Sequence, residues 1–171
     1  MNSSKEVMVG AGNTFIVTRT SALGLQGVSE GFVVKDESGA TQFELKYKMH
    51  LDWQEWQVLD ASGSVVAQME RHAHVHPTFT IDRAGQGQVT VRKADFMPLK
   101  QTWKVEGLAG GDVTVGGSFT DHEFTFTDAA GTAVAEASRR WATMHEGYGV
   151  TVQGLDPVIA ICAAVAMDVA E

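Results

Sequence analysis

The chain has 171 residues, of which 44% are hydrophobic and 20% are charged, so it can form one domain with a complete core. Its formal net charge of −8 at pH 7 argues against a general nucleic-acid-binding protein, which needs a basic surface. The single cysteine excludes an intrachain disulfide, and the N-terminus lacks the apolar core of a signal peptide, so we expect a cytoplasmic protein.

We expect residues 1–12 to form a flexible N-terminus, followed by short strands joined by tight turns. A repeated pattern marks the turns: an aromatic residue, Asp four positions later, and Gly three positions further. It occurs at Phe32–Gly39, Trp56–Gly63 and Phe124–Gly131, and in a shortened form at Phe79–Gly85. Asp can end a strand by hydrogen bonding to the turn backbone, and Gly can adopt the left-handed conformation that such a hairpin requires.

Alternating apolar residues flank these turns, which is typical of strands with one buried face. The pattern predicts about twelve strands. They lie near residues 14–19, 31–36, 41–48, 54–60, 64–72, 77–82, 87–93, 101–107, 111–117, 119–127, 132–140 and 146–153. The polar, glycine-containing segment Ser21–Glu30 is predicted to be a loop. Because no low-complexity linker divides the chain, we expect one domain over residues 1–171.

The last predicted element is an apolar helix that begins at Pro157. No polar side chain occurs from Pro157 to Met167, and Asp156 suits the N-cap position. A helix that is apolar on every side must be buried, and at about 1.5 Å per residue this one is too short for a bilayer core of roughly 30 Å. We therefore expect no transmembrane span. The predicted fold class is mainly β: a closed antiparallel barrel of about twelve strands around a buried C-terminal hydrophobic helix.

Several segments carry a resemblance to a known family. They are Phe32–Phe43, Trp56–Glu70, Met97–Val105, Asp121–Phe124, Ser138–Trp141, Tyr148–Val152 and the closing helix. In this order and spacing they resemble the LURP-one-related family, over nearly the whole chain. The resemblance implies the tubby C-terminal-like fold, whose more distant relatives include the phosphoinositide-binding tubby proteins and the phospholipid scramblases. It supplies no catalytic motif.

Six basic residues form the candidate binding site for an anion or a lipid. They are Arg92, Lys93, Lys100, Lys104, Arg139 and Arg140. If the barrel gathers them into one patch, they can hold a phosphate or an anionic lipid headgroup by charge-assisted hydrogen bonds. The alternative interpretation is that these six charges are scattered over the surface and keep the protein soluble, while their long side-chain stems cover apolar groups.

A run of three histidines, His72, His74 and His76, is the candidate metal site. Alternate residues of a strand share one face, and three imidazoles with an open position are a zinc ligand set. On a straight strand, however, successive members of the run lie about 6.6 Å apart, which is too far for one ion unless the chain bends at Pro77. The simpler interpretation is a solvated strand end.

We expect no catalytic residues and no cofactor. The favoured function is a cytoplasmic, non-enzymatic binding or scaffold domain, peripheral to the membrane when it binds lipid. Its candidate partners are an anionic phospholipid, a phosphate or a protein, and not nucleic acid. Two alternatives stay open: a scramblase-like membrane-associated protein, and a metal-dependent hydrolase that uses the histidine run. The sequence does not indicate an oligomeric state.

Overall fold

A computed structural model describes residues 13–24, 27–72, 76–94, 101–118, 123–138 and 147–170, with the backbone alone for residues 21–24, 27–30, 101 and 118. Residues 1–12, expected to form a flexible N-terminus, lie outside the described residues. Within these ranges the chain forms twelve strands and one helix, α2 (Pro157–Val169). The strands are β1 (Thr14–Gly24), β2 (Gly27–Asp36), β3 (Thr41–Met49), β4 (Trp53–Asp60), β5 (Val65–His72), β6 (Thr78–Arg83), β7 (Gly87–Lys93), β8 (Gln101–Glu106), β9 (Val113–Ser118), β10 (Glu123–Thr127), β11 (Ala133–Ser138) and β12 (Gly147–Val152).

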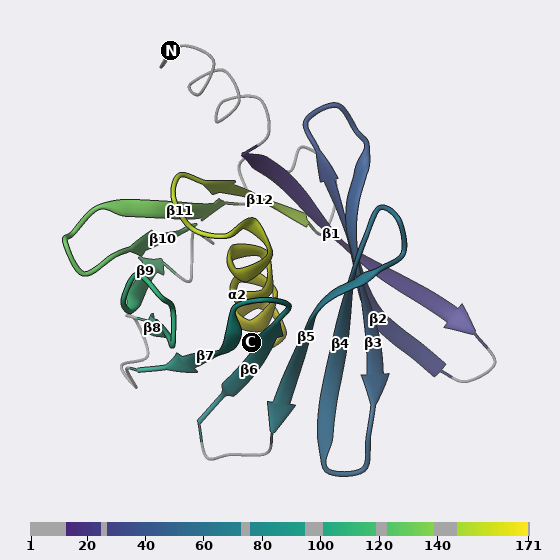
Figure 1. Cartoon of the computed structure of the whole chain (residues 1–171). Coiled ribbons are helices and arrows are strands. Elements are labelled where there is room, and N and C mark those ends of the chain that lie inside the picture. The colour runs from purple at the N-terminus through teal and green to yellow at the C-terminus, as the bar shows by residue number, and fades with distance from the viewer. Residues whose placement is uncertain are drawn as a thin grey trace.

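The strands form one antiparallel sheet that closes on itself around the helix (Figure 1). Each strand pairs with its neighbours in the sequence, and β1 completes the ring by pairing with both β2 and β12. Closure matters because an open sheet presents unpaired backbone groups at its two edges, which favour aggregation. The predicted fold class, a mainly β closed barrel with a C-terminal helix, is confirmed.

The three complete copies of the Asp-turn-Gly pattern form the same hairpin. Asp36 Oδ1 accepts hydrogen bonds from the backbone N–H groups of Ser38 (2.9 Å) and Ala40 (3.1 Å). Asp60 and Asp128 accept the equivalent bonds in their own turns. The three turn glycines have φ angles of 85° to 88°, a left-handed conformation that glycine adopts without strain. Beside each turn the pairing register shifts, which marks a β-bulge, the usual companion of a turn with a left-handed glycine.

The shortened copy of the pattern forms a different turn, so the predicted role of Asp82 is wrong. The turn after β6 is closed by a hydrogen bond from Gln86 N–H to the carbonyl of Arg83 (3.0 Å). Asp82 remains on the strand, where it is exposed and pairs in register with Gln68 and Gln88. The spacing from Asp82 to Gly85 is the same as in the complete copies, but only three positions separate Phe79 from Asp82 instead of four. Because side chains alternate along a strand, Asp82 lies on the face opposite to the buried Phe79, and the turn begins one residue later, at Arg83.

The prediction of a loop over Ser21–Glu30 is also wrong for the residues that the structure describes, since only residues 25 and 26 of that segment lie outside them and the rest belong to β1 and β2. The pairing of β1 with β2 continues without interruption from Thr20 and Gly31 to Gly24 and Gly27. Polar side chains and glycines suggested a loop, but a strand pair is held by backbone hydrogen bonds, and this segment contains no proline, so each of its residues has the backbone donor and acceptor that pairing needs.

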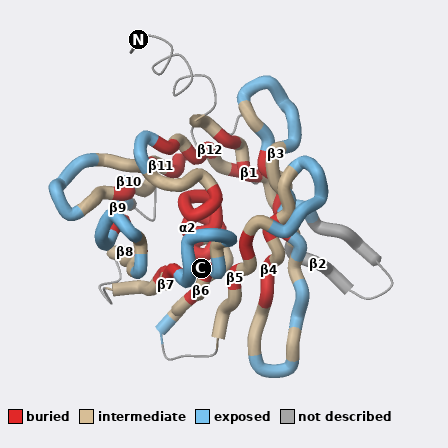
Figure 2. The backbone as a smooth tube through the Cα atoms, viewed as in Figure 1, coloured by how far each residue is buried: buried red, intermediate tan, exposed pale blue. Residues whose placement is uncertain are grey.

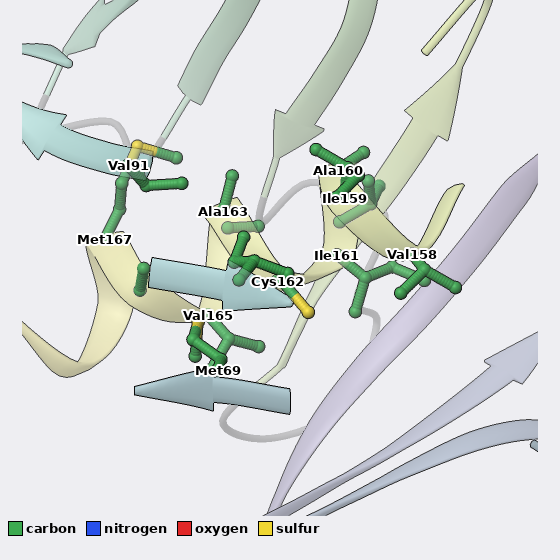
Figure 3. Close-up of a cluster of buried hydrophobic side chains, with 14 of the residues drawn as sticks. Met69, Val91, Val158, Ile159, Ala160, Ile161, Cys162, Ala163, Val165 and Met167 are labelled. Carbon is green, nitrogen blue, oxygen red and sulfur yellow. The ribbon is translucent and has the colours of Figure 1, made fainter. Parts of the chain in front are cut away.

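Helix α2 fills the interior of the barrel. All ten residues from Val158 to Met167 are buried, as the red helix at the centre of Figure 2 shows. They pack against inward side chains of the strands, including Met69 of β5 and Val91 of β7 (Figure 3). Burying a Val, Ile or Met side chain contributes about 1.5–3 kcal/mol, so the helix supplies much of the driving force for folding. Among the helices of the described ranges, none is long and apolar enough to cross a membrane.

The first turn of α2 is fixed by one carboxylate. Asp156 Oδ1 accepts the backbone N–H of Val158 (2.9 Å), which makes it the predicted N-cap. Its other oxygen, Oδ2, accepts from Arg83 Nε of β6 (3.0 Å) and from Gln86 Nε2 (2.7 Å). The barrel wall therefore helps to fix the position at which the helix begins.

The last turn of α2 is fixed by two arginines of the wall. Arg19 Nη2 of β1 donates to Asp168 Oδ2 (2.8 Å), and Arg71 Nη1 of β5 donates to the carbonyl of Val169 (3.2 Å). Positive charge at a helix C-terminus is favourable because unpaired carbonyls concentrate there. The guanidinium groups lie over the rings of Phe32 and Phe79 respectively, at 5.6 Å and 5.5 Å from the ring centroids.

Candidate functional site

The two ends of the barrel carry different connections. Because antiparallel neighbours alternate in direction, β3, β5, β7, β9 and β11 all finish at the end where α2 also finishes. We call this the helix-exit end. The Asp-turn-Gly hairpins lie at the opposite end, where α2 begins. The helix-exit end therefore carries connections other than these three hairpins.

An open pocket of about 380 Å³ lies at the helix-exit end, beside the turn between β3 and β4. It is lined by Met49, His50, Leu51, Asp52, Trp53, Gln54, Arg71 and His72. We call it the Trp53 pocket. The turn contributes most of the lining, and the end of β5 contributes the arginine and the second histidine.

Trp53 lies between two imidazole rings in the wall of the pocket. Its ring centroid is 3.7 Å from that of His50, with the planes 12° apart, and 6.0 Å from that of His72, with the planes 21° apart. Trp53 and His72 are register partners on β4 and β5. His50 is held in place by a hydrogen bond from its backbone N–H to the carbonyl of Trp53 (2.9 Å).

Each imidazole also contacts a glutamate. His50 Nε2 is 3.4 Å from Glu55 Oε2, and His72 Nε2 is 3.0 Å from Glu70 Oε2. Gln68 Nε2 donates to Glu70 Oε1 (2.9 Å) and to Glu55 Oε1. The Glu55 side chain is only 8% exposed, so these donors compensate a carboxylate that is largely removed from water. Both glutamates are engaged beside the pocket, and neither lines it.

Arg71 gives the pocket a permanent positive charge. One of its nitrogens bonds to the C-terminal turn of α2, and a guanidinium group has five N–H donors, so others remain for a ligand. Asp52, an exposed residue of the turn, supplies a negative charge to the same lining. The arrangement suits a phosphate or carboxylate that binds the arginine and lies against the aromatic wall.

Sequence reasoning missed this pocket, although one signal was present. The turn between two well-patterned strands reads Met49-His-Leu-Asp-Trp53, with apolar and aromatic residues where polar turn residues are usual. Met49 is 71% exposed and Leu51 is 98% exposed. A turn that places large apolar side chains in water indicates a contact surface.

The structure describes three of the six predicted basic residues. Arg92 and Lys104 are register partners on β7 and β8, and both lie on the outer face of the barrel. Arg92 forms an ion pair with Glu106, which reduces the positive charge available to a ligand. Lys93 follows Arg92 and pairs in register with the buried Trp103, so it belongs to the opposite face of the strand. Lys100, Arg139 and Arg140 lie outside the described residues.

Two of the three predicted metal-ligating histidines are described, and His74 lies outside the described residues. His72 takes part in the stack against Trp53 and contacts Glu70. His76 is exposed, four positions along the chain. Within the described ranges, no three His, Cys, Asp or Glu residues lie close enough together to hold a metal ion.

Cys162 is buried at the centre of α2, as the sequence predicted (Figure 3). Burial raises the pKa of its thiol to about 12, with a smaller contribution from the negative charge of Asp156, while Arg83 acts in the opposite direction. The thiolate is the nucleophilic form of cysteine, so this residue is chemically inert in the folded protein.

Comparison with known proteins adds a family and a fold. A family model described as LURP-one-related matches residues 13–168. The structure is also similar to the X-ray structure of a protein from Arabidopsis thaliana, with a TM-score of 0.61, 18% sequence identity and 94% of each chain covered. At this identity the likeness concerns the fold alone. Among curated proteins, the comparison found no match.

Proposed function

The chain belongs to the LURP-one-related family, and we propose that it is a non-enzymatic binding domain that holds an anionic group at the helix-exit end of its barrel. The anionic group is a phosphate, either free or in a lipid headgroup. The Trp53 pocket carries the proposal, because it combines a guanidinium with two imidazoles in an open, aromatic-walled cavity.

The filled interior supports a ligand site on the outside of the barrel. Helix α2 occupies the space that other barrels use for a ligand, and its residues from Val158 to Met167 are buried. A small molecule therefore has to bind on the wall or at an end. The hairpin end has a larger open pocket, of about 670 Å³, but its lining sets Lys35 beside the carboxylates of Asp36 and Glu37, which disfavour an anion. The Trp53 pocket at the helix-exit end combines Arg71 with an aromatic wall.

The chemistry of the lining favours phosphate. Arg71 can donate two parallel hydrogen bonds to phosphate oxygens. Asp52 opposes this binding, so the affinity should be modest and should fall as salt rises.

The predicted basic patch extends the proposal. Lys93 ends β7 at the helix-exit end, and Arg92 and Lys104 lie on the adjacent outer face. We include all six basic residues as secondary contacts for a larger headgroup, and we place the protein in the cytoplasm, peripheral to the membrane.

The proposal is tested with two soluble probes, inorganic phosphate and inositol trisphosphate, titrated at low salt while amide and imidazole NMR signals are followed. Binding should shift the signals of His50 and His72. Arg71→Gln should weaken binding by about tenfold to a hundredfold, since a charge-assisted contact contributes about 1.5–3 kcal/mol. The matched control is Arg19→Gln, because Arg19 also supports the end of α2 and lies over a phenylalanine, yet is absent from the pocket lining.

Loss of binding in Arg71→Gln together with retention in Arg19→Gln supports the proposal. If the wild-type protein binds neither probe at low salt, or if both variants bind as it does, the pocket is not an anion site and the proposal is wrong.

A further inference from the structure

The turn between β3 and β4 presents the most exposed apolar side chains of the described residues. Only Met49, Leu51 and Val65 are large hydrophobic residues exposed to solvent in the described ranges, and two of these three flank His50 in one turn. Leu51 is almost as exposed as it would be in an unfolded chain, at 98%. The core does not need these side chains, and their exposure to water is unfavourable.

Basic residues precede Met49 and Leu51, the apolar tip of this turn, along β3. Lys46 and Lys48 alternate on the outer face of β3 and are both exposed. Neither forms an ion pair with a described residue, and Arg71 adds a third positive charge across the Trp53 pocket. The two nearest glutamates of β4 and β5 are engaged by Gln68 and the two histidines. The exposed carboxylate in the turn itself is Asp52.

An apolar tip with cations set back from it is the arrangement of a segment that enters a membrane interface. The apolar side chains reach the acyl boundary, the cations meet lipid phosphates, and a tryptophan such as Trp53 suits the headgroup level between them. A stable protein interface needs about 800 Å² from each partner, with a packed centre. One projecting turn with two apolar side chains offers much less than that, whereas a bilayer surface adapts to it.

From these observations we propose that the turn Met49–Trp53 docks the barrel onto an anionic lipid bilayer, with Met49 and Leu51 entering the interface and Lys46 and Lys48 contacting lipid phosphates. The inference rests on the proposed function, because the Trp53 pocket lies beside the same turn and faces the headgroups when the turn is docked. The inference adds two points to that function. The phosphate belongs to a membrane surface, and the barrel binds with its helix-exit end toward the lipid.

The test is flotation of the full chain with vesicles of phosphatidylcholine alone, and with phosphatidylserine or a phosphoinositide added. The wild type should float with the anionic vesicles and not with phosphatidylcholine alone. Replacing Met49 and Leu51 together by Ser should lower the affinity about tenfold or more. Val65→Ser is the matched control, because Val65 is 52% exposed but begins β5 at the opposite end of the barrel.

A second pair of variants separates local charge from net charge. Replacing both Lys46 and Lys48 by Ala should weaken binding about fivefold for each residue removed, because a cation near an anionic surface contributes about that factor. Lys35→Ala removes an exposed lysine of β2 at the hairpin end and should have little effect. Asp52→Asn should strengthen binding, since it removes a carboxylate from the docked turn.

Brominated lipids independently measure how deeply a tryptophan enters the bilayer, because they quench only the fluorescence of tryptophan side chains that reach them. Part of the fluorescence should be quenched in the wild type, and that part should be absent in Trp53→Phe.

The outcomes separate this inference from the proposed function. If inositol trisphosphate binds at Arg71 but the wild type floats with no vesicle, the pocket is an anion site and membrane docking is wrong. Docking is equally wrong if the Met49 and Leu51 variant floats as the wild type does. Capture of a protein through the turn with no vesicle binding would replace the membrane by a protein partner and overturn the inference.

Discussion

Arg83 and Asp156 join the wall of the barrel to the first turn of its central helix, with Arg83 Nε 3.0 Å from Asp156 Oδ2. Both side chains are mostly buried, at 21% and 15% exposure. The same carboxylate caps the helix through its other oxygen, so one residue carries two separable interactions. Arg83 also donates to the carbonyl of Val66, which fixes its position on the wall (2.9 Å).

These two interactions can be measured separately. Asp156→Asn keeps a good N-cap and loses the ion pair, whereas Asp156→Ala loses both, so the alanine variant should be less stable than the asparagine variant by about 1 kcal/mol. The free energy of unfolding in urea measures the difference. In an Arg83→Ala background the cost of Asp156→Asn should shrink, and an unchanged cost would mean that the ion pair contributes nothing to stability.

Gly117 allows a close approach between β9 and β10. A Cβ atom added there would lie 1.9 Å from the carbonyl oxygen of Glu123 and 2.8 Å from Phe124 Cα, and both of these are backbone atoms. Gly117→Ala should therefore destabilise the protein by about 1–3 kcal/mol, as overpacking does. Gly116→Ala is the control, because an added Cβ there meets nothing within 4 Å. Equal unfolding midpoints for the two variants would contradict the close approach.

Cys162 should serve as a reporter of the position of α2. With its thiol pKa raised to about 12, it should not react with a thiol reagent at neutral pH while the helix is inside the barrel. Stability should fall as pH rises from the ordinary thiol value of 9.0 toward 12, because the unfolded chain releases this proton first. The labelling rate measured against urea concentration should follow global unfolding.

The same reagent tests the scramblase-like alternative. If α2 leaves the barrel to enter a membrane, adding anionic vesicles should accelerate the labelling of Cys162 under native conditions. We expect no acceleration, because release would break the contacts of Arg83 and Arg19 with the two ends of the helix and expose its buried face.

The pKa values of two hairpin aspartates, Asp36 and Asp60, are lowered by hydrogen bonds within their own turns. The pKa of Asp36 lies below its ordinary value of 3.8, chiefly because the Ser38 hydroxyl and the turn backbone donate to the carboxylate. Since the folded pKa is the lower one, the stabilisation is complete above 3.8 and is lost as pH falls through the folded value. Carboxyl NMR titration should show Ser38→Ala raising the pKa of Asp36 while leaving that of Asp60 unchanged. A shift at both sites would point to a global change.

How far the sequence predicts this protein depends on how local each feature is. The hairpins are local, because an aromatic residue, an aspartate four positions later and a glycine three further together define the hydrogen bonds and the positive φ angle. The burial of α2 is nearly local, because a helix that is apolar on every side must be enclosed. These features made the barrel and its central helix predictable.

The Trp53 pocket was not predictable in this way, because it depends on register. Trp53 and His72 are 19 positions apart in the sequence, and they meet only because β4 and β5 pair with that offset. Arg92 and Lys104 likewise lie side by side through the pairing of β7 with β8, and the ion pair of Arg92 with Glu106 is a diagonal contact across the same two strands. The residue types along one strand do not determine which residues of the neighbouring strand lie beside them.

The order of elements along the chain has a consequence for biosynthesis. The first strand, β1, finds one of its two partners in β12, and the core of the barrel is the segment that follows β12. Until β12 and α2 have been translated, the growing sheet has neither its closing partner nor the helix that fills it. Native packing must then wait for the segment Pro157–Val169, and a nascent chain that stalls shortly before Pro157 would be left as an unfilled sheet with an exposed apolar inner face.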